Sequence, residues 1–389
     1  MSKLELIATA TFGLESVVKR EIENLGYKVT KSEDAKITYM TDERGIVRSN
    51  LWLRCADRVL LKMGEFMAES SEELFQQTKA IPWEQWIPED GKFTVTCTTV
   101  KSKLRSEPAC QKTVKKAIVE RMGECYMREQ FPETGASYTV KVTLLKDRAT
   151  LTIDTSGSGL HTRGYRKNPV RAPIKETLAA ALVQLSYWKT GRLLVDPFCG
   201  SGTIPIEAAM ICRNIAPGLG RTFASAEWDC IAPEIWKEER TRAYAGIDYD
   251  ADVRILASDI DRKAVEAARL NAEEAGVDDC IDFSVRDFLS MEKMPEPYTI
   301  LISNPPYGQR VGDRKILQAV NGHFRELLAA DESLSCYVIT ADRTLEKAIG
   351  RKADRRRKLY NGNLETCYYQ YYGRRPPKKE NEGNVSSVR

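Results

Sequence analysis

The chain has 389 residues, of which 42% are hydrophobic, 29% charged and 8% aromatic, and its formal net charge is +4. This composition fits a globular protein of two or three domains and excludes collagen-like, wholly disordered and small disulfide-rich classes. No apolar run reaches the ~18 residues that a membrane span needs, and the first residues show no signal-peptide pattern. We therefore expect a cytoplasmic protein that does not enter membranes.

The ten cysteines are dispersed along the chain, and none of them forms a C-x-x-C pair. There are only two histidines, His161 and His323, so zinc ligands would have to come from widely separated positions. We expect no metal site, and we expect the cysteines to be reduced thiols that behave as small hydrophobic residues.

Basic residues gather in two parts of the chain. Residues 101–175 contain 16 Lys and Arg and residues 351–389 contain 11, in each case at least twice the number of acidic residues. Lys and Arg release counterions when they bind phosphates, so this asymmetry favours a nucleic acid as partner, and a solvated surface is the alternative. The candidate contacts are Lys101, Lys103 and Arg105, then Arg163, Arg166 and Lys167, and the cluster 355-RRRK-358.

Residues 1–160 are predicted to form two small α+β units. Residues 1–67 should contain a strand over 4–10, a helix over 14–25 and a strand over 58–67. Residues 68–160 should contain a helix from 71, a strand over 92–100, a helix over 107–125 and a hairpin of strands over 137–145 and 149–155. The small residues 156–159 and the basic segment 161–172 are predicted to be a linker.

Residues 173–377 alternate between helices and apolar strands, which is typical of a parallel sheet in an α/β domain. Strands are predicted over 193–195, 255–257, 281–285, 299–302 and 336–340, with an edge strand over 364–372. Helices are predicted over 175–188, 203–212, 261–275 and 315–329. We expect residues 213–250 to be an irregular insertion and residues 378–389 to be a disordered tail.

A glycine-rich motif, 196-DPFCGSGT-203, lies where a predicted strand meets a predicted helix. In open α/β sheets such a junction borders the ligand crevice, and Gly200 and Gly202 would let the backbone approach a ligand closely. The motif has neither the Lys-Ser/Thr of a P-loop nor the G-x-G-x-x-G spacing of a nicotinamide dehydrogenase. A purely structural glycine turn is the alternative.

Acidic motifs follow the next two predicted strands. Asp259 could accept hydrogen bonds from ribose hydroxyls, provided that 213–250 is an insertion that widens the usual spacing. Asp261 could be no more than a helix N-cap. Asp287 could meet an adenine amino group and Phe288 could stack on the ring, although a structural role is the alternative for so short a motif.

The motif 303-SNPPYG-308 follows an apolar predicted strand. Asn304 offers a side-chain carbonyl, and the Pro305–Pro306 turn could aim a main-chain carbonyl beside it, so that two acceptors meet the two N–H bonds of a planar amine. Tyr307 could stack on the base that carries this amine. An aromatic amine is a weak nucleophile, and polarising its N–H bonds while aligning the nitrogen with an electrophilic methyl group would lower the barrier.

These four motifs should meet at one place. The carboxyl ends of parallel strands share one edge of a sheet, so a single crevice is predicted for Asp196, Asp259, Asp287 and Asn304. Such a crevice could hold a nucleoside, its charged methyl donor and a flat amine.

Residues 173–340 resemble the class I S-adenosylmethionine-dependent methyltransferases, whose domain is a Rossmann-like α/β fold with a mostly parallel sheet. The segment 196-DPFCGSG-202 resembles their cofactor loop, and 304-NPPY-307 resembles the signature of enzymes that methylate nucleobase amino groups. The segment 160–182 is similar to the joint between a THUMP domain and its methyltransferase. Residues 68–160 fit the THUMP pattern, and residues 1–67 resemble a ferredoxin-like α+β unit.

The group with the greatest resemblance is the bacterial 23S ribosomal RNA guanine-N2 methyltransferases, although this chain lacks the second methyltransferase domain fused in some members. The resemblance implies methyl transfer from S-adenosylmethionine to the N2 amine of a guanine in RNA, with 23S ribosomal RNA favoured. A transfer-RNA guanine-N2 methyltransferase, a DNA adenine-N6 methyltransferase and a non-catalytic RNA-binding or ribosome assembly factor are the alternatives.

The resemblance also implies residue roles. The target base, extruded from its stack, would be held by Asn304, Pro305, Pro306 and Tyr307. The cofactor would be bound by Asp196, Pro197, Phe198, Cys199, Gly200, Ser201, Gly202, Thr203, Asp259, Ile260, Asp287, Phe288 and Asn304, with Glu207 and Thr177 at its methionine end.

Overall fold

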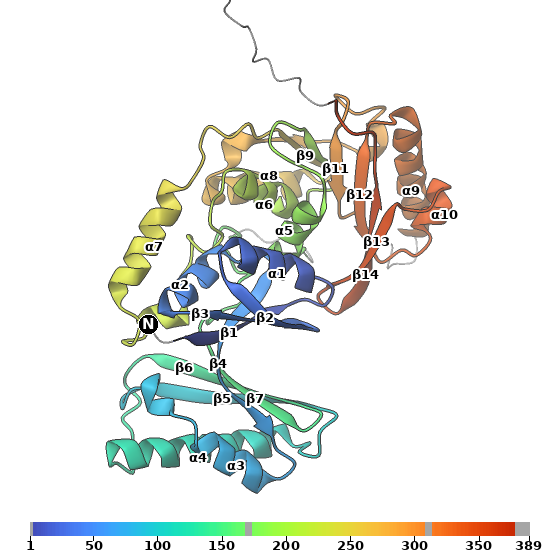
Figure 1. Cartoon of the computed structure of the whole chain (residues 1–389). Coiled ribbons are helices and arrows are strands. Elements are labelled where there is room, and N and C mark those ends of the chain that lie inside the picture. The colour runs from blue at the N-terminus through green and yellow to red at the C-terminus, as the bar shows by residue number, and fades with distance from the viewer. Residues whose placement is uncertain (1–2, 168–172, 308–312, 378–389) are drawn as a thin grey trace, which may run out of the picture.

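The computed structural model describes residues 3–167, 173–307 and 313–377, and the predicted tail over 378–389 lies outside these residues. It contains two seven-stranded sheets, which lie one above the other in Figure 1, with the first in blue to green and the second in green to red. Among the described residues, no helix combines the length and the apolar character needed to cross a membrane.

The first sheet extends through both N-terminal units. Its spatial order is β2 (Lys28–Glu33), β3 (Lys36–Thr41), β1 (Leu4–Ala10), β4 (Ala56–Met67), β7 (Arg148–Asp154), β6 (Ser137–Leu145) and β5 (Lys92–Val100). Neighbours are antiparallel except β5 and β6, which are parallel. Because β4 pairs with β1 on one side and with β7 on the other, the two units share this strand.

Four helices pack on the first sheet: α1 (Glu15–Asn24), α2 (Glu43–Trp52), α3 (Ser71–Lys79) and α4 (Glu107–Tyr126). Helices α1 and α2 lie on the side that faces the second sheet, and α3 and α4 lie on the far side (Figure 1). The elements predicted for residues 1–160 are confirmed, but β2, β3 and α2 were not predicted. Strand β2 is exposed along most of its length, so its sequence, KVTKSE, carries no apolar alternation.

The predicted linker is a packed joint over its described part. Ser156 is fully buried and donates a hydrogen bond of 2.6 Å to Asn50 Oδ1, and its hydroxyl accepts one from the Val59 backbone N–H. Further along, Arg163 and Tyr165 are also buried. The predicted linker is thus well packed at these positions, and residues 168–172 lie outside the described residues.

The second sheet has the spatial order β10 (Ile281–Val285), β9 (Ile255–Asp259), β8 (Leu194–Asp196), β11 (Ile300–Ser303), β12 (Ser335–Thr340), β14 (Leu364–Tyr371) and β13 (Arg355–Asn361). The first five strands are parallel, and β14 is antiparallel to both of its neighbours. The prediction that 364–372 forms the edge is wrong, because β13 lies outside it. The basic run 355-RRRK-358 has no apolar alternation, so β13 could not be predicted from the sequence pattern.

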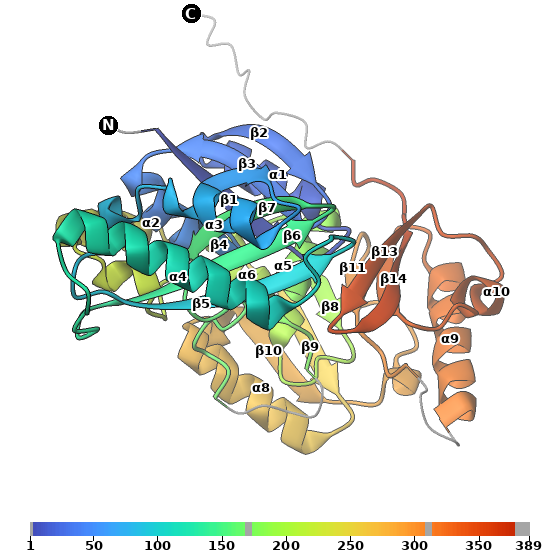
Figure 2. The same ribbon diagram turned by 90° about the horizontal axis from the view of Figure 1, so that it is seen from below.

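Helices flank the second sheet: α5 (Glu176–Leu185), α6 (Thr203–Cys212), α8 (Arg262–Ala275), α9 (Asp313–Ala330) and α10 (Leu345–Ile349). Figure 2 shows α9 and α10 beyond the β13–β14 hairpin. The region 213–250 is not wholly irregular as predicted, because it contains α7 (Pro233–Ala245). This helix binds the first unit, where Arg44 donates hydrogen bonds of 2.7 Å to both Glu238 and Glu239.

The chain reverses its direction across the second sheet between β8 and β11. Strands β8, β9 and β10 follow one another towards one edge, whereas β11 and β12 extend towards the other. In parallel α/β sheets, such a reversal opens a crevice beyond the carboxyl ends of the strands. All of the predicted site motifs follow the strands that border it.

Candidate active site

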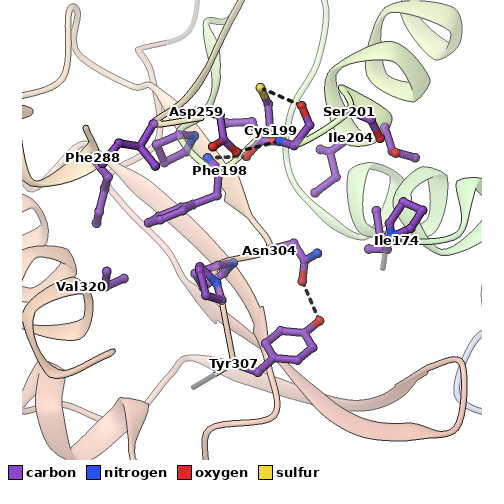
Figure 3. Close-up of a pocket in the computed structure, with 18 of the residues that line it drawn as sticks. Ile174, Phe198, Cys199, Ser201, Ile204, Asp259, Phe288, Asn304, Tyr307 and Val320 are labelled. Atoms are coloured by element: carbon purple, nitrogen blue, oxygen red, sulfur yellow. Dashed lines mark hydrogen bonds between the residues drawn. The ribbon is translucent and has the colours of Figure 1, made fainter. Parts of the chain in front are cut away.

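A cavity of about 840 Å³ opens at this crevice. Every segment that the sequence motifs nominated contributes to it, as do residues before α5 and the turn between β13 and β14 (Figure 3). The nominated residues in its wall are Asp196, Pro197, Phe198, Cys199, Gly200, Ser201, Thr203, Asp259, Ile260, Asp287, Phe288, Asn304, Pro305, Pro306 and Tyr307.

Asp196 is a buried acid in the cavity wall. Its Oδ1 accepts a hydrogen bond of 3.2 Å from the Phe198 backbone N–H, whereas Oδ2 has no partner among the described residues. Burial raises the pKa of Asp196 to about 8, and the charge of nearby Asp259 adds to the effect. An acid left unpaired in this way favours a ligand that brings a positive charge or a hydrogen-bond donor.

Asp259 ties the glycine-rich loop to the neighbouring strand. Its Oδ2 accepts a hydrogen bond of 3.0 Å from the Gly200 backbone N–H, and its Oδ1 accepts one from the Asp261 backbone N–H. Asp261 caps α8 by accepting from the Lys263 backbone N–H, so the N-cap interpretation of Asp261 is confirmed. Carboxylate oxygens accept more than one hydrogen bond, so Asp259 can also receive hydroxyl donors from a ligand.

The cavity wall also includes exposed apolar side chains. Ile260 is 68% exposed, and Leu289 and Ile316 are also exposed, which is unusual for large apolar side chains that line a pocket. Phe288, in contrast, is only 3% exposed, because its ring packs against Phe198 at a centroid distance of 4.9 Å. These aliphatic side chains offer free surface to a flat ring, whereas Phe288 lines the cavity with little of its own ring exposed.

The opposite end of the cavity is formed by the turn after β11. The Tyr307 hydroxyl donates a hydrogen bond of 2.6 Å to Asn304 Oδ1, drawn as a dashed line in Figure 3. Asn361, the last residue of β13, donates to the Tyr307 hydroxyl at 3.4 Å. Burial raises the pKa of Tyr307, so this hydroxyl stays protonated near neutral pH.

Among the described residues that line the cavity, no side chain is an activated nucleophile. Burial raises the pKa of the Cys199 thiol well above its usual value, so it is not a thiolate. Neither histidine lines the cavity, and no cluster of three potential metal ligands occurs in the described parts of the chain. The chemistry that this arrangement supports is therefore binding, orientation and polarisation.

Comparison with known proteins decides the family. The family described as RMKL-like, methyltransferase domain, matches residues 163–370, more than half of the chain. The chain belongs to the RMKL-like methyltransferases. An RlmL ferredoxin-like domain matches residues 5–60 and a THUMP domain matches residues 68–154. The sheet order of the second unit is that of the class I methyltransferases, as the resemblance implied.

Similar proteins agree with this family over their full length. One, "Putative RNA methyltransferase YpsC" of Bacillus subtilis, is 47% identical over 98% of this chain and 100% of its own. A predicted N6-adenine-specific DNA methylase from Listeria monocytogenes is 44% identical, with a TM-score of 0.91 over 96% of this chain and 97% of its own. SMU.472, described as a methyltransferase complexed with SAH, is 41% identical, with a TM-score of 0.91 over 97% of this chain and 100% of its own.

The methyltransferase cavity fits S-adenosylmethionine, the methyl donor of this class. Its volume is in the range of small-molecule sites. The unpaired oxygen of Asp196 suits a cationic ligand, Asp259 suits hydroxyl groups, and the surface around Ile260 suits a flat ring. Asn304 and Tyr307 lie at the other end, where a second flat molecule could approach.

Three of the predicted cofactor residues do not line the cavity. Gly202 has a φ of +84°, and a Cβ there would lie 3.0 Å from Ala268 Cβ, so this glycine allows α6 to approach α8. Glu207 is fully buried and accepts hydrogen bonds from Arg163 and from the Tyr165 hydroxyl. The hydroxyl of Thr177 is buried without a hydrogen-bond partner among the described residues. The structure thus gives Glu207 and Thr177 no direct access to a ligand.

The predicted RNA-binding residues separate into two sets. Arg163 is buried against Glu207, and Arg166 donates to the Ile174 carbonyl and to the Thr203 hydroxyl. Both arginines hold the joint together and are not available to RNA, which corrects the prediction. The candidates with exposed side chains are Lys101, Lys103 and Arg105 beyond the end of β5, Lys167 in the joint, and Arg355, Arg356 and Lys358 of β13.

Sequence reasoning missed the residues that β13 and β14 bring to the cavity. Asn361 ends β13 and Gly362 begins the two-residue turn to β14, and Lys175 lines the cavity from the segment before α5. The two turn residues are Gly362 and Asn363, and Gly-Asn between two extended segments is a hairpin signal, with Gly362 at the positive φ, +62°, that such turns use. This dipeptide could have revealed the hairpin, although not its contact with the cavity.

Proposed function

We propose that this methyltransferase transfers a methyl group from S-adenosylmethionine to the N2 amine of a guanine in RNA, and that 23S ribosomal RNA is the substrate. We also propose that it acts in the cytoplasm, because ten cysteines without a disulfide are typical of a reducing compartment. The resemblance of the sequence to the ribosomal guanine-N2 enzymes supports the choice of base and of RNA.

The observation that carries the proposal is the convergence of two half-sites in one cavity. The half around Asp196 and Asp259 suits the methyl donor, and the half around Asn304 suits a planar amine. Bound S-adenosylmethionine supplies an electrophilic methyl group. Asn304 Oδ1 and the Pro305 carbonyl would accept hydrogen bonds from the two N–H groups of the amine. These bonds would polarise the amine and hold its nitrogen lone pair towards the methyl group.

Tyr307 completes the binding of the base. Its ring lies beside Asn304 and could hold the plane of a guanine by stacking. An alkylated aromatic amine gives up its proton readily to water, so the reaction does not require a strong base among the described residues of the cavity wall. A guanine within a duplex or folded RNA would have to leave its stack to reach Asn304.

Two features support RNA over DNA as the substrate. A THUMP domain precedes the methyltransferase domain, and exposed basic residues lie beyond the end of its strand β5. The similar Listeria protein is named as a DNA adenine methylase, so adenine in DNA is the alternative to test. A transfer-RNA guanine is the second alternative, since the same architecture could serve it.

The test is methylation of total RNA and of genomic DNA by the purified protein with labelled S-adenosylmethionine. The nucleosides are then separated after digestion. We expect label in N2-methylguanosine from RNA, mainly from the 23S fraction. Label confined to DNA adenine, or to transfer RNA, would overturn the corresponding part of the proposal.

A further inference from the structure

A loop of the ferredoxin-like unit meets the edge of the catalytic sheet beside the cavity. Arg357 of β13 donates a hydrogen bond of 2.8 Å to the Gly13 carbonyl and one of 3.2 Å to the Ser16 hydroxyl. Gly13 approaches so closely that a Cβ there would lie 2.5 Å from the Lys358 carbonyl oxygen. In Figure 1 the tip of the β13–β14 hairpin lies next to this unit.

The loop over 11–14 is held rigidly. The Thr11 carbonyl accepts a hydrogen bond of 3.0 Å from the Leu14 backbone N–H, and the Thr11 hydroxyl donates to Asp57. Glu15 accepts from the backbone N–H groups of both Gly13 and Ala35. The conformation of this loop is therefore fixed by its own hydrogen bonds and by its contact with β13.

This rigid loop presents an exposed aromatic ring. Phe12 is 46% exposed, and its ring meets that of Tyr360 edge to face at a centroid distance of 6.1 Å. The Lys358 ammonium lies 5.4 Å from the Tyr360 ring, although it also pairs with Glu365. A large apolar side chain held in solvent on an ordered loop suits a ligand with a flat, apolar face.

The aromatic pair lies at the β13–β14 hairpin, which also contributes to the cavity wall. Tyr360 precedes Asn361, which lines the cavity and donates to the Tyr307 hydroxyl, and that hydroxyl donates to Asn304. Tyr360 is therefore one residue along β13 from the cavity wall, and its ring lies on the opposite face of the strand from the Asn361 side chain, because side chains alternate along a strand. When one base leaves its stack, its neighbour in the chain exposes a face that can stack on an aromatic side chain.

We propose that Phe12 and Tyr360 form a stacking platform for the RNA base adjacent to the methylated nucleotide, so that the ferredoxin-like unit supplies part of the substrate site. This inference rests on the proposed action on RNA. It assigns a binding residue outside the methyltransferase domain, and it explains why β13 holds the first unit so closely. The nearby cation, Lys358, favours a nucleic acid over an apolar protein partner.

The test compares variants of the full-length protein for their KM for RNA at saturating S-adenosylmethionine. Phe12→Leu keeps apolar contact with Tyr360 but removes the flat ring, and Phe12→Trp restores a ring. Stacking on one base is worth roughly 5- to 150-fold in affinity. We expect Phe12→Leu to raise the KM for RNA at least about 5-fold and Phe12→Trp to stay within about 2-fold of wild type.

Controls separate stacking from folding and from the proposed function. Affinity for S-adenosylmethionine should not change in either variant, and Tyr244→Leu, at an exposed tyrosine of α7, should not change the KM for RNA. A KM for Phe12→Leu equal to that of wild type would overturn the platform. If wild type methylates no RNA, the proposed function fails, and the platform is then tested by measuring RNA affinity directly. Equal affinity of wild type and Phe12→Leu for RNA would overturn the platform. Weaker RNA binding by the variant would support it.

Discussion

The Tyr307 hydroxyl donates a 2.6 Å hydrogen bond to Asn304 Oδ1, the oxygen that would accept the target amine. An amide oxygen has two lone pairs, so an incoming amine can donate to Asn304 Oδ1 beside the hydroxyl or in its place. Tyr307 is therefore well placed to keep Asn304 oriented before the base arrives and to stack on the base afterwards. The first prediction concerns the acceptor itself.

Asn304→Ala should lower kcat by about 100-fold, because removal of one preorganised polar partner of the transition state costs a factor of this order. The affinity for RNA should not change, since the phosphate contacts that dominate it lie elsewhere. Steady-state kinetics and filter binding with the same RNA measure the two quantities. Unchanged turnover would show that Asn304 does not act on the amine.

Binding of a cationic donor should depend on the ionisation of Asp196. Its pKa is raised to about 8 by burial, so the acid is largely protonated in the free protein at pH 7. A cation bound beside it favours the carboxylate, so affinity for S-adenosylmethionine should rise as pH increases from about 7 to 9 and the proton is released more easily. Calorimetric titration measures this dependence. Asp196→Asn should remove it, and an equal slope in wild type and variant would contradict the assignment.

The same raised pKa affects stability with the opposite sign. The folded state keeps Asp196 protonated up to about pH 8, whereas an unfolded chain ionises it near its usual value of 3.8. The contribution of Asp196 to stability therefore falls as pH rises between these two values. Urea unfolding of wild type and Asp196→Asn at pH 5 and pH 7.5 should show the variant gaining relative stability at the higher pH, and a gain at the lower pH would contradict the shift.

Glu207 should matter for stability and not for binding of the methyl donor. Glu207→Gln leaves Arg163 buried with a weakened partner, and breaking a buried ion pair costs roughly 3 kcal/mol. The exposed pair of Lys167 and Glu274 gives a matched control, since Glu274→Gln should cost under ~1 kcal/mol. Urea midpoints and calorimetry test both points. A stable Glu207→Gln variant that has lost affinity for S-adenosylmethionine would contradict this and would support the role that the resemblance implied, binding of the methionine end of the cofactor.

The basic residues beyond the end of β5 should contribute to RNA binding by charge. Lys101 and Arg105 are exposed and have no ion pair among the described residues, whereas Lys103 is already paired with Glu69. The double change Lys101→Gln and Arg105→Gln should weaken binding and reduce the slope of log affinity against log salt by roughly 1.5. Lys103→Gln should have a smaller effect, and Lys237→Gln on α7 serves as the distant control. A slope unaffected by the double change would place the RNA elsewhere.

The sequence predicted the catalytic sheet well because its strands are buried. Strands such as β11 and β12 have no exposed residue, and their continuous apolar runs leave little ambiguity. Strands β2 and β13 were missed because exposed and charged side chains replace the apolar pattern there. The apolar pattern of a sequence indicates a strand only where the side chains of that strand are buried.

The candidate site was predictable to the extent that it is local in sequence. Asp196, Asp259 and Asn304 each follow a strand, so topology alone brings them together. Asn361 reaches the cavity only through the pairing of β13 with β14, which no local motif specifies. The burial of Arg163 could not be predicted either, because its partner, Glu207, lies 44 residues away on α6.

The most direct test of the central claim is nucleoside mass spectrometry of RNA from a strain that lacks this protein. We expect one N2-methylguanosine to disappear from 23S ribosomal RNA and to return with the wild-type protein, but not with Asn304→Ala. An unchanged content of N2-methylguanosine in the deletion strain would contradict the account.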